Sequence, residues 1–295
     1  GAVTITNDIG GTNLPDVTNV DGSAASGPLN ITINGTDVED VDTGSAGDMV
    51  HVKNSHTDAT YDTNGGNDTV EVDVFGTSAT LNTGGGGDKI ELDTSLTSTD
   101  QKIDGGDGSD TLEVSTDVTN GDYDNIETVE VVGSADQIDL SLFDDNLQTV
   151  EVEATGTTAA RIALTDLPAD VTVEAVANAN LDLISGTANT AEFVANGDLN
   201  LQNNSAATDV ENINISFSSA ATSTLTLIGT ATETLTVLDA NGTVALTGAG
   251  ISNTTTGVTS IDASRLSESV NIGASTATGA GNVGALVTGS GDDTV

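Results

Sequence analysis

The sequence predicts an all-β protein, a parallel β-helix or β-roll-like solenoid with about 20 residues per coil. Three observations support this prediction. A glycine-rich turn followed by an aspartate recurs at regular intervals between residues 44 and 114. Short runs that alternate apolar and polar residues, the pattern of strands with one buried face, continue through the chain. Hydrophobic residues make up 36% of the chain but aromatic residues only 2%, which suits the thin core of stacked coils.

The repeat is defined by four copies of this turn: GSAGDMVHV (44–52), GGNDTVEVDV (65–74), GGGGDKIEL (84–92) and GGDGSDTLEV (105–114). Their aspartates, Asp48, Asp68, Asp88 and Asp110, are 20, 20 and 22 residues apart. Only the last copy matches the full nonapeptide G-G-x-G-x-D-x-U-x of calcium-binding parallel β-helices. The other copies keep the aspartate and an apolar residue two places later.

The first 118 residues contain two predicted regions. Residues 1–43 hold short strands, such as Val3–Ile5 and Ile31–Ile33, that lead into the repeats. Residues 44–118 form the glycine–aspartate array. Between its turns lie second strand-like pieces at 59–62, 79–82 and 101–104, so each repeat is expected to be one coil with two strands and two corners. Only one corner of each coil carries the calcium-type sequence.

Residues 119–286 are predicted to be a Thr/Ala-rich β-helical region. Its strand patterns occur at 126–131, 147–152, 171–173, 181–183, 210–215, 225–227 and 235–237, and the first two begin 21 residues apart. The glycine–aspartate pattern returns at 287–295, where we predict the start of a second, truncated array. We therefore expect the chain to be an excerpt of a longer protein, with any secretion signal outside it.

The charge and the cysteine count exclude several kinds of function. With 46 acidic and 5 basic residues, the net charge of −41 disfavours binding to nucleic acids and to anionic membranes. The chain has no cysteine, which removes disulfides, thiolate catalysis and cysteine-based zinc sites. No run approaches the roughly 20 apolar residues that cross a bilayer. We predict no nucleic-acid partner and no membrane insertion.

Stacking of the repeats would place the four aspartates in a ladder along one edge. Equivalent residues of neighbouring parallel coils lie about 4.8 Å apart. At an effective dielectric constant of 20, two carboxylates at that distance repel each other by roughly 3.5 kcal/mol. A divalent cation between coils reverses the sign of this energy. Carboxylate and carbonyl oxygens without His or Cys favour Ca²⁺, so several calcium ions are the predicted cofactors.

The predicted calcium site has principal and auxiliary members. The principal ligands are the aspartates of the glycine turns, and the glycines supply the positive φ angles that turn carbonyls toward the ion. The full set is Asp48, Asp68, Asp88, Asp110 and Asp293, with Asp104, Asp107, Asn67 and Asn64 as auxiliary ligands and with Gly84, Gly86, Gly106 and Gly108 among the turn glycines (84–87, 105, 106 and 108). The competing interpretation is a set of ordinary solvated acidic turns.

No catalytic site is predicted, and we expect the protein not to be an enzyme. His51 and His56 flank Lys53 without a third ligand pattern, which is typical of incidental histidines. Carboxylate pairs suited to a glycosidase are so abundant that nothing marks one of them as special. Few aromatic residues are present to hold a sugar chain.

The order of the elements resembles the RTX-type proteins exported by type I secretion, and among them the calcium-dependent surface-layer (S-layer) proteins of Gram-negative bacteria such as Caulobacter. The RTX likeness rests on 44–114 and 289–295. The S-layer likeness covers roughly 60–295 and adds Ile126–Val129, Val210–Ile215 and Val258–Ser264 in that order. The resemblance implies a β-helical lattice domain with many Ca²⁺ ions, whose calcium positions correspond to Asp68, Asp88, Asp110 and Asp293. The sequence departs from the family's motif where Thr63-Asn64 replace the opening Gly-Gly before Asp68, and where Thr83 and Thr288 replace the first glycine of theirs.

These observations predict a structural function. We expect an extracellular protein of the bacterial cell surface that folds and self-assembles on binding Ca²⁺, forming a surface layer or a filament. Its partners would be further copies of itself, with cell-surface polysaccharide as an additional partner through a region outside this chain. The alternative is the stalk or ligand-binding region of a large RTX adhesin or biofilm matrix protein.

Overall fold

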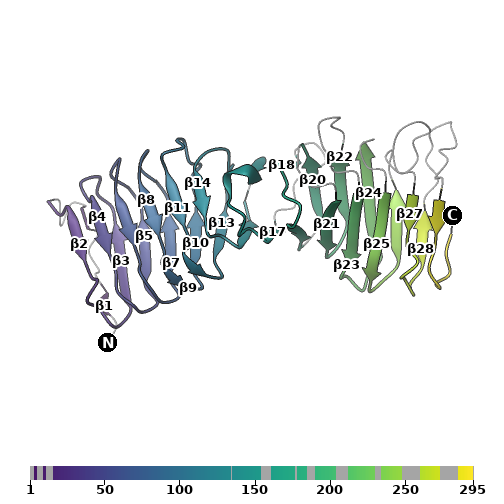
Figure 1. The fold of residues 1–295 in the computed structure, drawn as a ribbon, viewed down its shortest axis with the longest axis horizontal. Coiled ribbons are helices and arrows are strands. Elements are labelled where there is room, and N and C mark those ends of the chain that lie inside the picture. The colour runs from purple at the N-terminus through teal and green to yellow at the C-terminus, as the bar shows by residue number, and fades with distance from the viewer. Residues whose placement is uncertain are drawn as a thin grey trace. The chain divides into compact units, whose positions relative to one another are not determined.

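A computed structural model describes residues 3–4, 9–10, 16–133, 135–153, 161–176, 178–184, 190–203, 212–229, 234–247, 260–272 and 285–294. The chain divides into two compact units. Unit 1 contains Gly1–Ala135 and Leu142–Leu147, and unit 2 contains Asp136–Ser141 and Gln148–Val295. Both are parallel β-solenoids, which confirms the predicted fold class, and each turn of the chain takes roughly 21 residues. In each unit the strands lie side by side in chain order (Figure 1).

Unit 1 is built from two long parallel sheets, because each coil contributes one strand to each of them. The first sheet has the order β1 (Val3–Thr4), β3 (Leu29–Ile33), β5 (Met49–Val52), β7 (Thr69–Val72), β10 (Lys89–Leu92), β13 (Thr111–Val114) and β15 (Thr128–Val131). The second has the order β2 (Asn19–Asp21), β4 (Asp40–Asp42), β6 (Thr60–Asp62), β8 (Thr80–Asn82), β11 (Lys102–Asp104) and β14 (Asp122–Asp124). The predicted two strands per coil are thus confirmed.

A third, very short sheet forms within the glycine turns. It pairs β9 (Gly85–Gly86) with β12 (Asp107–Gly108) in parallel, so the turns of two successive coils hydrogen-bond to each other directly. Gly65 adds an isolated bridge to Gly85 from the coil before. The glycine turns therefore stack as closely as the strands do.

The core of unit 1 consists of one apolar side chain stacked above another. Along the first sheet, Val50, Val70, Ile90, Leu112 and Val129 are paired in register, and all are fully buried. Facing them from the second sheet are the buried side chains Val41, Tyr61, Leu81, Ile103 and Tyr123. Burial of each such side chain contributes about 1.5–3 kcal/mol. The alternation that predicted the strands is the alternation of core and outward positions.

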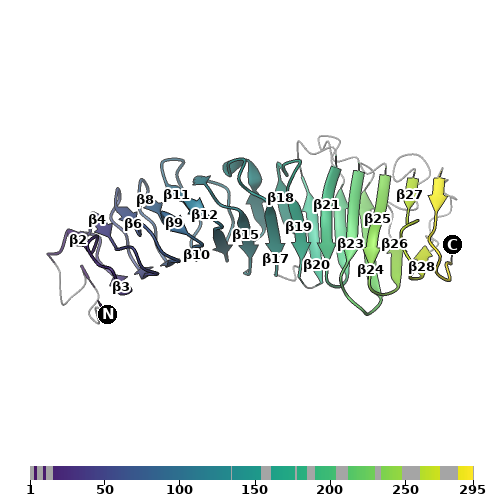
Figure 2. The same cartoon turned by 60° about the horizontal axis from the view of Figure 1, so that its bottom comes forward.

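Unit 2 repeats this arrangement with longer strands (Figure 2). Its first sheet has the order β17 (Thr149–Val152), β19 (Thr172–Ala175), β21 (Thr190–Ala195), β23 (Asn212–Phe217), β25 (Thr234–Ala240), β27 (Ser260–Asp262) and β29 (Ala285–Val287). Its second sheet has the order β16 (Gln137–Asp139), β18 (Ile162–Thr165), β20 (Ala179–Leu183), β22 (Leu199–Asn203), β24 (Ser223–Gly229), β26 (Val244–Thr247) and β28 (Val270–Ile272). A 3₁₀ turn at Leu140–Leu142 follows β16.

Parts of several segments predicted from the sequence lie outside the described residues. Ile5, the first two residues of the strand expected at 210–215, and the first two of the segment 258–264 lie outside them. Within the part of the chain that the structure describes, no helix is long and apolar enough to cross a membrane. The glycine–aspartate array lies entirely in unit 1.

Candidate metal centre

The four aspartates of the array, Asp48, Asp68, Asp88 and Asp110, each lie one residue before a strand of the first sheet. We call them the aspartate column. Their side chains are buried, with only 3%, 2%, 3% and 0% of the residue surface exposed. Carboxylic acids are almost never fully buried without partners. The question for this site is therefore what pairs with each carboxylate.

One oxygen of each carboxylate accepts a backbone hydrogen bond from the coil before. Asp48 N–H donates to Asp68 Oδ1 at 2.7 Å, and Asp68 N–H donates to Asp88 Oδ1 at 2.7 Å. Asp88 N–H in turn donates to Asp110 Oδ1 at 2.8 Å. At the start of the column, Leu29 N–H donates to Asp48 Oδ1 at 2.7 Å. Each aspartate is thus a hydrogen-bond acceptor for the backbone of its neighbour, as well as a charge.

The second oxygen distinguishes three of the aspartates from the first. Oδ2 of Asp48 accepts a hydrogen bond from Gly44 N–H at 3.0 Å. Oδ2 of Asp68, Asp88 and Asp110 is buried and has no hydrogen-bond partner. A buried, unpaired carboxylate oxygen is costly and calls for a proton or a cation. These three oxygens fit the chemistry of a calcium site, which takes carboxylate oxygens as ligands.

Burial also changes how readily these groups take up protons. Burial raises the pKa of Asp68 to about 6, against the lowering effect of the bond from Asp48 N–H. Burial likewise raises the pKa of Asp110 to about 6, and the charge of Asp88 adds to this. The pKa of Asp88 is raised for the same first reason. Without a cation, the carboxylates of Asp68, Asp88 and Asp110 therefore hold protons more tightly than solvated aspartates do.

A column of threonines lies beside the aspartates. The hydroxyls of Thr43 and Thr63 donate to the carbonyls of Thr63 and Thr83 in the next coil, at 3.0 and 3.1 Å. The Thr83 hydroxyl donates to Gly105 O at 2.8 Å. These hydroxyls give their protons to the carbonyls, but Thr63 and Thr83 also lie close enough to Asp68 and Asp88 to lower the pKa of those two carboxyl groups, opposing the effect of burial. The departures from glycine at Thr63 and Thr83 thus place a hydroxyl near the carboxylates of Asp68 and Asp88.

The turn glycines are needed because successive turns touch. Gly84 and Gly106 have φ angles of 86° and 87°, which a side chain rarely tolerates. A Cβ at Gly86 would overlap the carbonyl oxygen of Gly66, and one at Gly108 would overlap that of Gly86. Of the glycines expected at positive φ, Gly85, Gly87 and Gly105 are not in that region. Their neighbours Gly84, Gly86 and Gly106 make the turn instead.

The auxiliary residues Asn64, Asn67, Asp104 and Asp107 lie in or next to the turns, where three of them make hydrogen bonds of their own. Asn67 and Asp107 are exposed, and Asn67 Oδ1 accepts a bond from Gly87 N–H at 3.1 Å. Asp104 Oδ1 accepts from Gly106 N–H at 3.1 Å and from Asn125 Nδ2 at 2.8 Å. Asn64, at φ 61°, donates from Nδ2 to Thr43 O at 2.9 Å. Other ligands of a bound ion would be backbone carbonyls and water.

Asp293 lies at an equivalent turn but beside a different sheet. Val270 N–H donates to its Oδ1 at 3.0 Å, so the backbone cap recurs in unit 2. Val270 begins β28, which belongs to the second sheet of unit 2, whereas the aspartate column flanks the first sheet of unit 1. The closing motif therefore has the same local chemistry at the opposite sheet.

One carboxylate that continues the aspartate column into the next coil, that of Glu127, was not predicted from the sequence. Asp110 N–H donates to Glu127 Oε2 at 2.7 Å, so Glu127 supplies the carboxylate for the next coil. This coil is short: Leu112 pairs with Val129, only 17 residues later, and the glycine turn is absent from it. The signal was the shared pattern of an acid, a threonine and an apolar residue in 110–112 and 127–129.

Comparisons of the chain with protein-family models, with curated proteins and with solved structures find no significant match.

Proposed function

We propose that this chain is part of an extracellular structural protein of the bacterial surface, a β-solenoid that folds and assembles when it binds calcium. The observation that supports this best is the set of three buried, unpaired Oδ2 atoms at Asp68, Asp88 and Asp110. They recur once per coil at the same place in the turn. A periodic deficit of positive charge is what a periodic set of cations would correct.

The chain's own residues would make folding depend on the ion. Oδ1 of each aspartate joins one coil to the next through a backbone hydrogen bond, whether or not a cation is present. Bound Ca²⁺ would be the positively charged partner that Oδ2 of Asp68, Asp88 and Asp110 lacks. Because the net charge is −41, the calcium-free chain also repels itself as a whole. Low calcium would then favour the loosely folded chain, and calcium near millimolar concentrations the folded one.

Self-association is the second part of the proposal. Screening and ion binding would reduce repulsion between copies of so acidic a chain, allowing them to associate as a sheet or a filament. The proposal rests on the aspartate column and on the charge.

Electron microscopy and light scattering of the purified chain test this function. With about millimolar calcium we expect sheets or filaments, since weak multi-oxygen sites fill in that range. Removal of calcium with a chelator should dissolve them. Particles that stay monomeric at every calcium concentration, yet bind a glycan or a host surface, would favour the adhesin alternative instead.

A further inference from the structure

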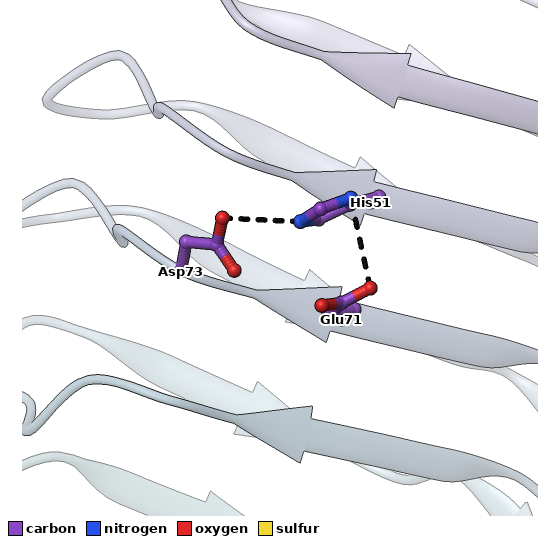
Figure 3. A group of neighbouring side chains, drawn as sticks. All are labelled: His51, Glu71 and Asp73. Atoms are coloured by element: carbon purple, nitrogen blue, oxygen red, sulfur yellow. Dashed lines mark ion pairs between the residues drawn. The ribbon is translucent and has the colours of Figure 1, made fainter.

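A second group of metal-ligand side chains lies on the outer face of the first sheet, apart from the aspartate column. His51 in β5 is paired in register with Glu71 in β7, and Asp73 follows β7 on the same face. Among the described residues, these three form the group of His and acidic side chains whose ligand atoms lie within 4.8 Å of one another. Figure 3 shows the imidazole between the two carboxylates.

The two carboxylates lie near different nitrogens of the His51 ring. Nε2 of His51 lies 3.1 Å from Asp73 Oδ2, and Nδ1 lies 3.6 Å from Glu71 Oε2. The side chains of Glu71 and Asp73 are 42% and 41% exposed, whereas that of His51 is 23% exposed. The two carboxylates are therefore open to ions from solution, while the ring is largely covered.

The Nε2 atom has an unusual environment. It is shielded from solvent and has no hydrogen-bond partner, although Asp73 Oδ2 is only 3.1 Å away. A hydrogen on Nε2 would thus not point at this oxygen. Two ligands at about 2.0–2.2 Å from one ion, 3.1 Å apart, subtend an angle of about 95° at the ion. The two atoms form an ion pair when His51 is protonated, and their short distance without hydrogen-bond alignment also fits two ligands of one metal.

Glu71 completes the arrangement from the other side of the ring. A histidine that binds a metal through one nitrogen usually donates its other N–H to a carboxylate, which fixes the orientation of the ring. Glu71 Oε2 lies 3.6 Å from Nδ1, an ion-pair contact on the side of the ring that this role requires. The ligand set of imidazole and carboxylate favours transition metals such as Zn²⁺ and Co²⁺ over Ca²⁺ and Mg²⁺.

We propose that His51 and Asp73 bind a divalent transition-metal ion on the outer face of the first sheet, with Glu71 as the residue that positions the imidazole. The ion would link two successive coils, since His51 and Asp73 belong to different ones. This site is independent of the calcium proposal, because it uses none of the aspartate column.

Titration of the calcium-loaded chain with Zn²⁺ or Co²⁺ tests this site. The chain must carry no polyhistidine tag, so that its histidines are only His51 and His56. Nuclear magnetic resonance of the two rings, together with calorimetry, should show that His51 binds through Nε2. We expect His51→Gln to abolish this binding event, and Asp73→Asn and Glu71→Gln to weaken it by roughly 10–100-fold.

His56→Gln is the matched control, because His56 also faces a carboxylate, with its Nδ1 2.6 Å from Asp58 Oδ1. This variant should bind the metal as the wild-type chain does. Circular dichroism establishes that His51→Gln is folded, and the wild-type ring signals decide the matter if it is not. Unchanged His51 signals in excess Zn²⁺, or equal calorimetric titrations for His51→Gln and wild type, would overturn the proposal and assign any binding to the diffuse acidic surface.

Discussion

At the scale of single residues, each aspartate of the column has two separable roles. Oδ1 of Asp88 accepts the backbone N–H of Asp68, and Oδ2 is the unpaired oxygen assigned to calcium. An amide can replace the first role but not the second, since Asn keeps one carbonyl oxygen and loses the charge. Substitutions at this position can therefore distinguish hydrogen bonding from ion binding.

Asp88→Asn should leave the calcium-free fold intact but remove one calcium-binding event. The calcium-dependent gain in unfolding free energy, about 2.7 kcal/mol at a concentration 100-fold above Kd, should fall measurably. Asp88→Ala should in addition destabilise the calcium-free protein by about 1–3 kcal/mol, because Asp68 N–H loses its acceptor. Calorimetric calcium titration and urea unfolding measure the two effects.

Asp182→Asn is the control for this pair of variants. Asp182 lies in β20 of unit 2 and accepts a bond from Gln202 Nε2 at 2.8 Å, outside the aspartate column. It should bind calcium as the wild-type chain does. Equal calcium titrations for Asp88→Asn, Asp182→Asn and wild type would contradict a role for the column.

The raised pKa values predict that the calcium-free protein becomes more stable as the pH falls from neutral, the opposite of ordinary acid denaturation. Asp68 and Asp110 have pKa values of about 6 in the fold, above the ordinary 3.8. Between these values the folded state binds more protons than the unfolded state, so stability rises as pH falls from above 6 toward 4. We expect the unfolding free energy of the calcium-free protein to be at least about 1.4 kcal/mol higher at pH 5 than at pH 7.5, because about one extra proton is bound per group over roughly one pH unit below the folded pKa.

Urea unfolding of calcium-free protein at the two pH values measures this gain. The double variant Asp68→Asn/Asp110→Asn subtracts the general effect of lowering the net charge, which all the other carboxylates share. If the double variant keeps the full pH dependence of the wild type, the gain does not come from the column.

The sequence predicted where the aspartates lie along the repeat, but not how deeply their side chains are buried. The spacing of Asp48, Asp68, Asp88 and Asp110 identified the column, because a repeat of 20 residues places equivalent residues in register. Their burial was not predicted, since an aspartate before a strand is ordinarily solvated. Only the stacked coils show that the carboxylate turns inward to accept a neighbour's N–H.

At the scale of elements, the glycine turns are a sheet in their own right. Gly85 and Gly86 pair with Asp107 and Gly108, and the close approach of these backbones explains why glycine recurs. The need is strict at alternate positions only. A Cβ at Gly86 would overlap a neighbouring carbonyl oxygen, whereas one at Gly85 meets nothing nearer than Asp107 O at 3.9 Å.

Gly86→Ala and Gly85→Ala are therefore a matched pair of adjacent substitutions. Gly86 also has φ 156°, so alanine there is strained both by conformation and by contact. We expect Gly86→Ala to lower the unfolding free energy by about 1–3 kcal/mol and Gly85→Ala to change it by less than about 0.5 kcal/mol. Thermal and urea unfolding compare them; similar losses would mean that the turns do not stack as described.

The sequence predicted that these elements are strands, but it did not predict the length of every coil. Alternation of apolar and polar residues located the strands at 126–131 and 147–152, which the structure confirms as β15 and β17. The 17-residue step from Leu112 to Val129 was hidden, because a coil can lose its whole glycine turn while keeping both strands. Strand alternation reports burial on one face and says nothing about how long the connecting turn is.

At the scale of the whole molecule, charge is the dominant feature. A net charge of −41 on 295 residues stabilises the solvated, separated chain and opposes compact or assembled states. Cations that bind the folded chain alone oppose this repulsion and shift the equilibrium toward it. Monovalent salt screens the same repulsion without occupying a site.

This difference gives a prediction for the intact chain. Calcium at about millimolar concentration should raise the β-type circular dichroism or the unfolding temperature more than NaCl of equal ionic strength does. Chelation should reverse the calcium effect alone. Equal effects of the two salts would mean that general screening, and not a site, accounts for the stabilisation.

The most direct measurement is a crystal structure of the chain grown with calcium, with anomalous scattering used to locate the ions. We expect calcium peaks within about 2.3–2.6 Å of Oδ2 of Asp68, Asp88 and Asp110. Asp48 serves as an internal comparison for calcium occupancy, because its Oδ2 already accepts a hydrogen bond from Gly44 N–H. If no peak lies beside these three oxygens at saturating calcium, protons satisfy the column and calcium does not.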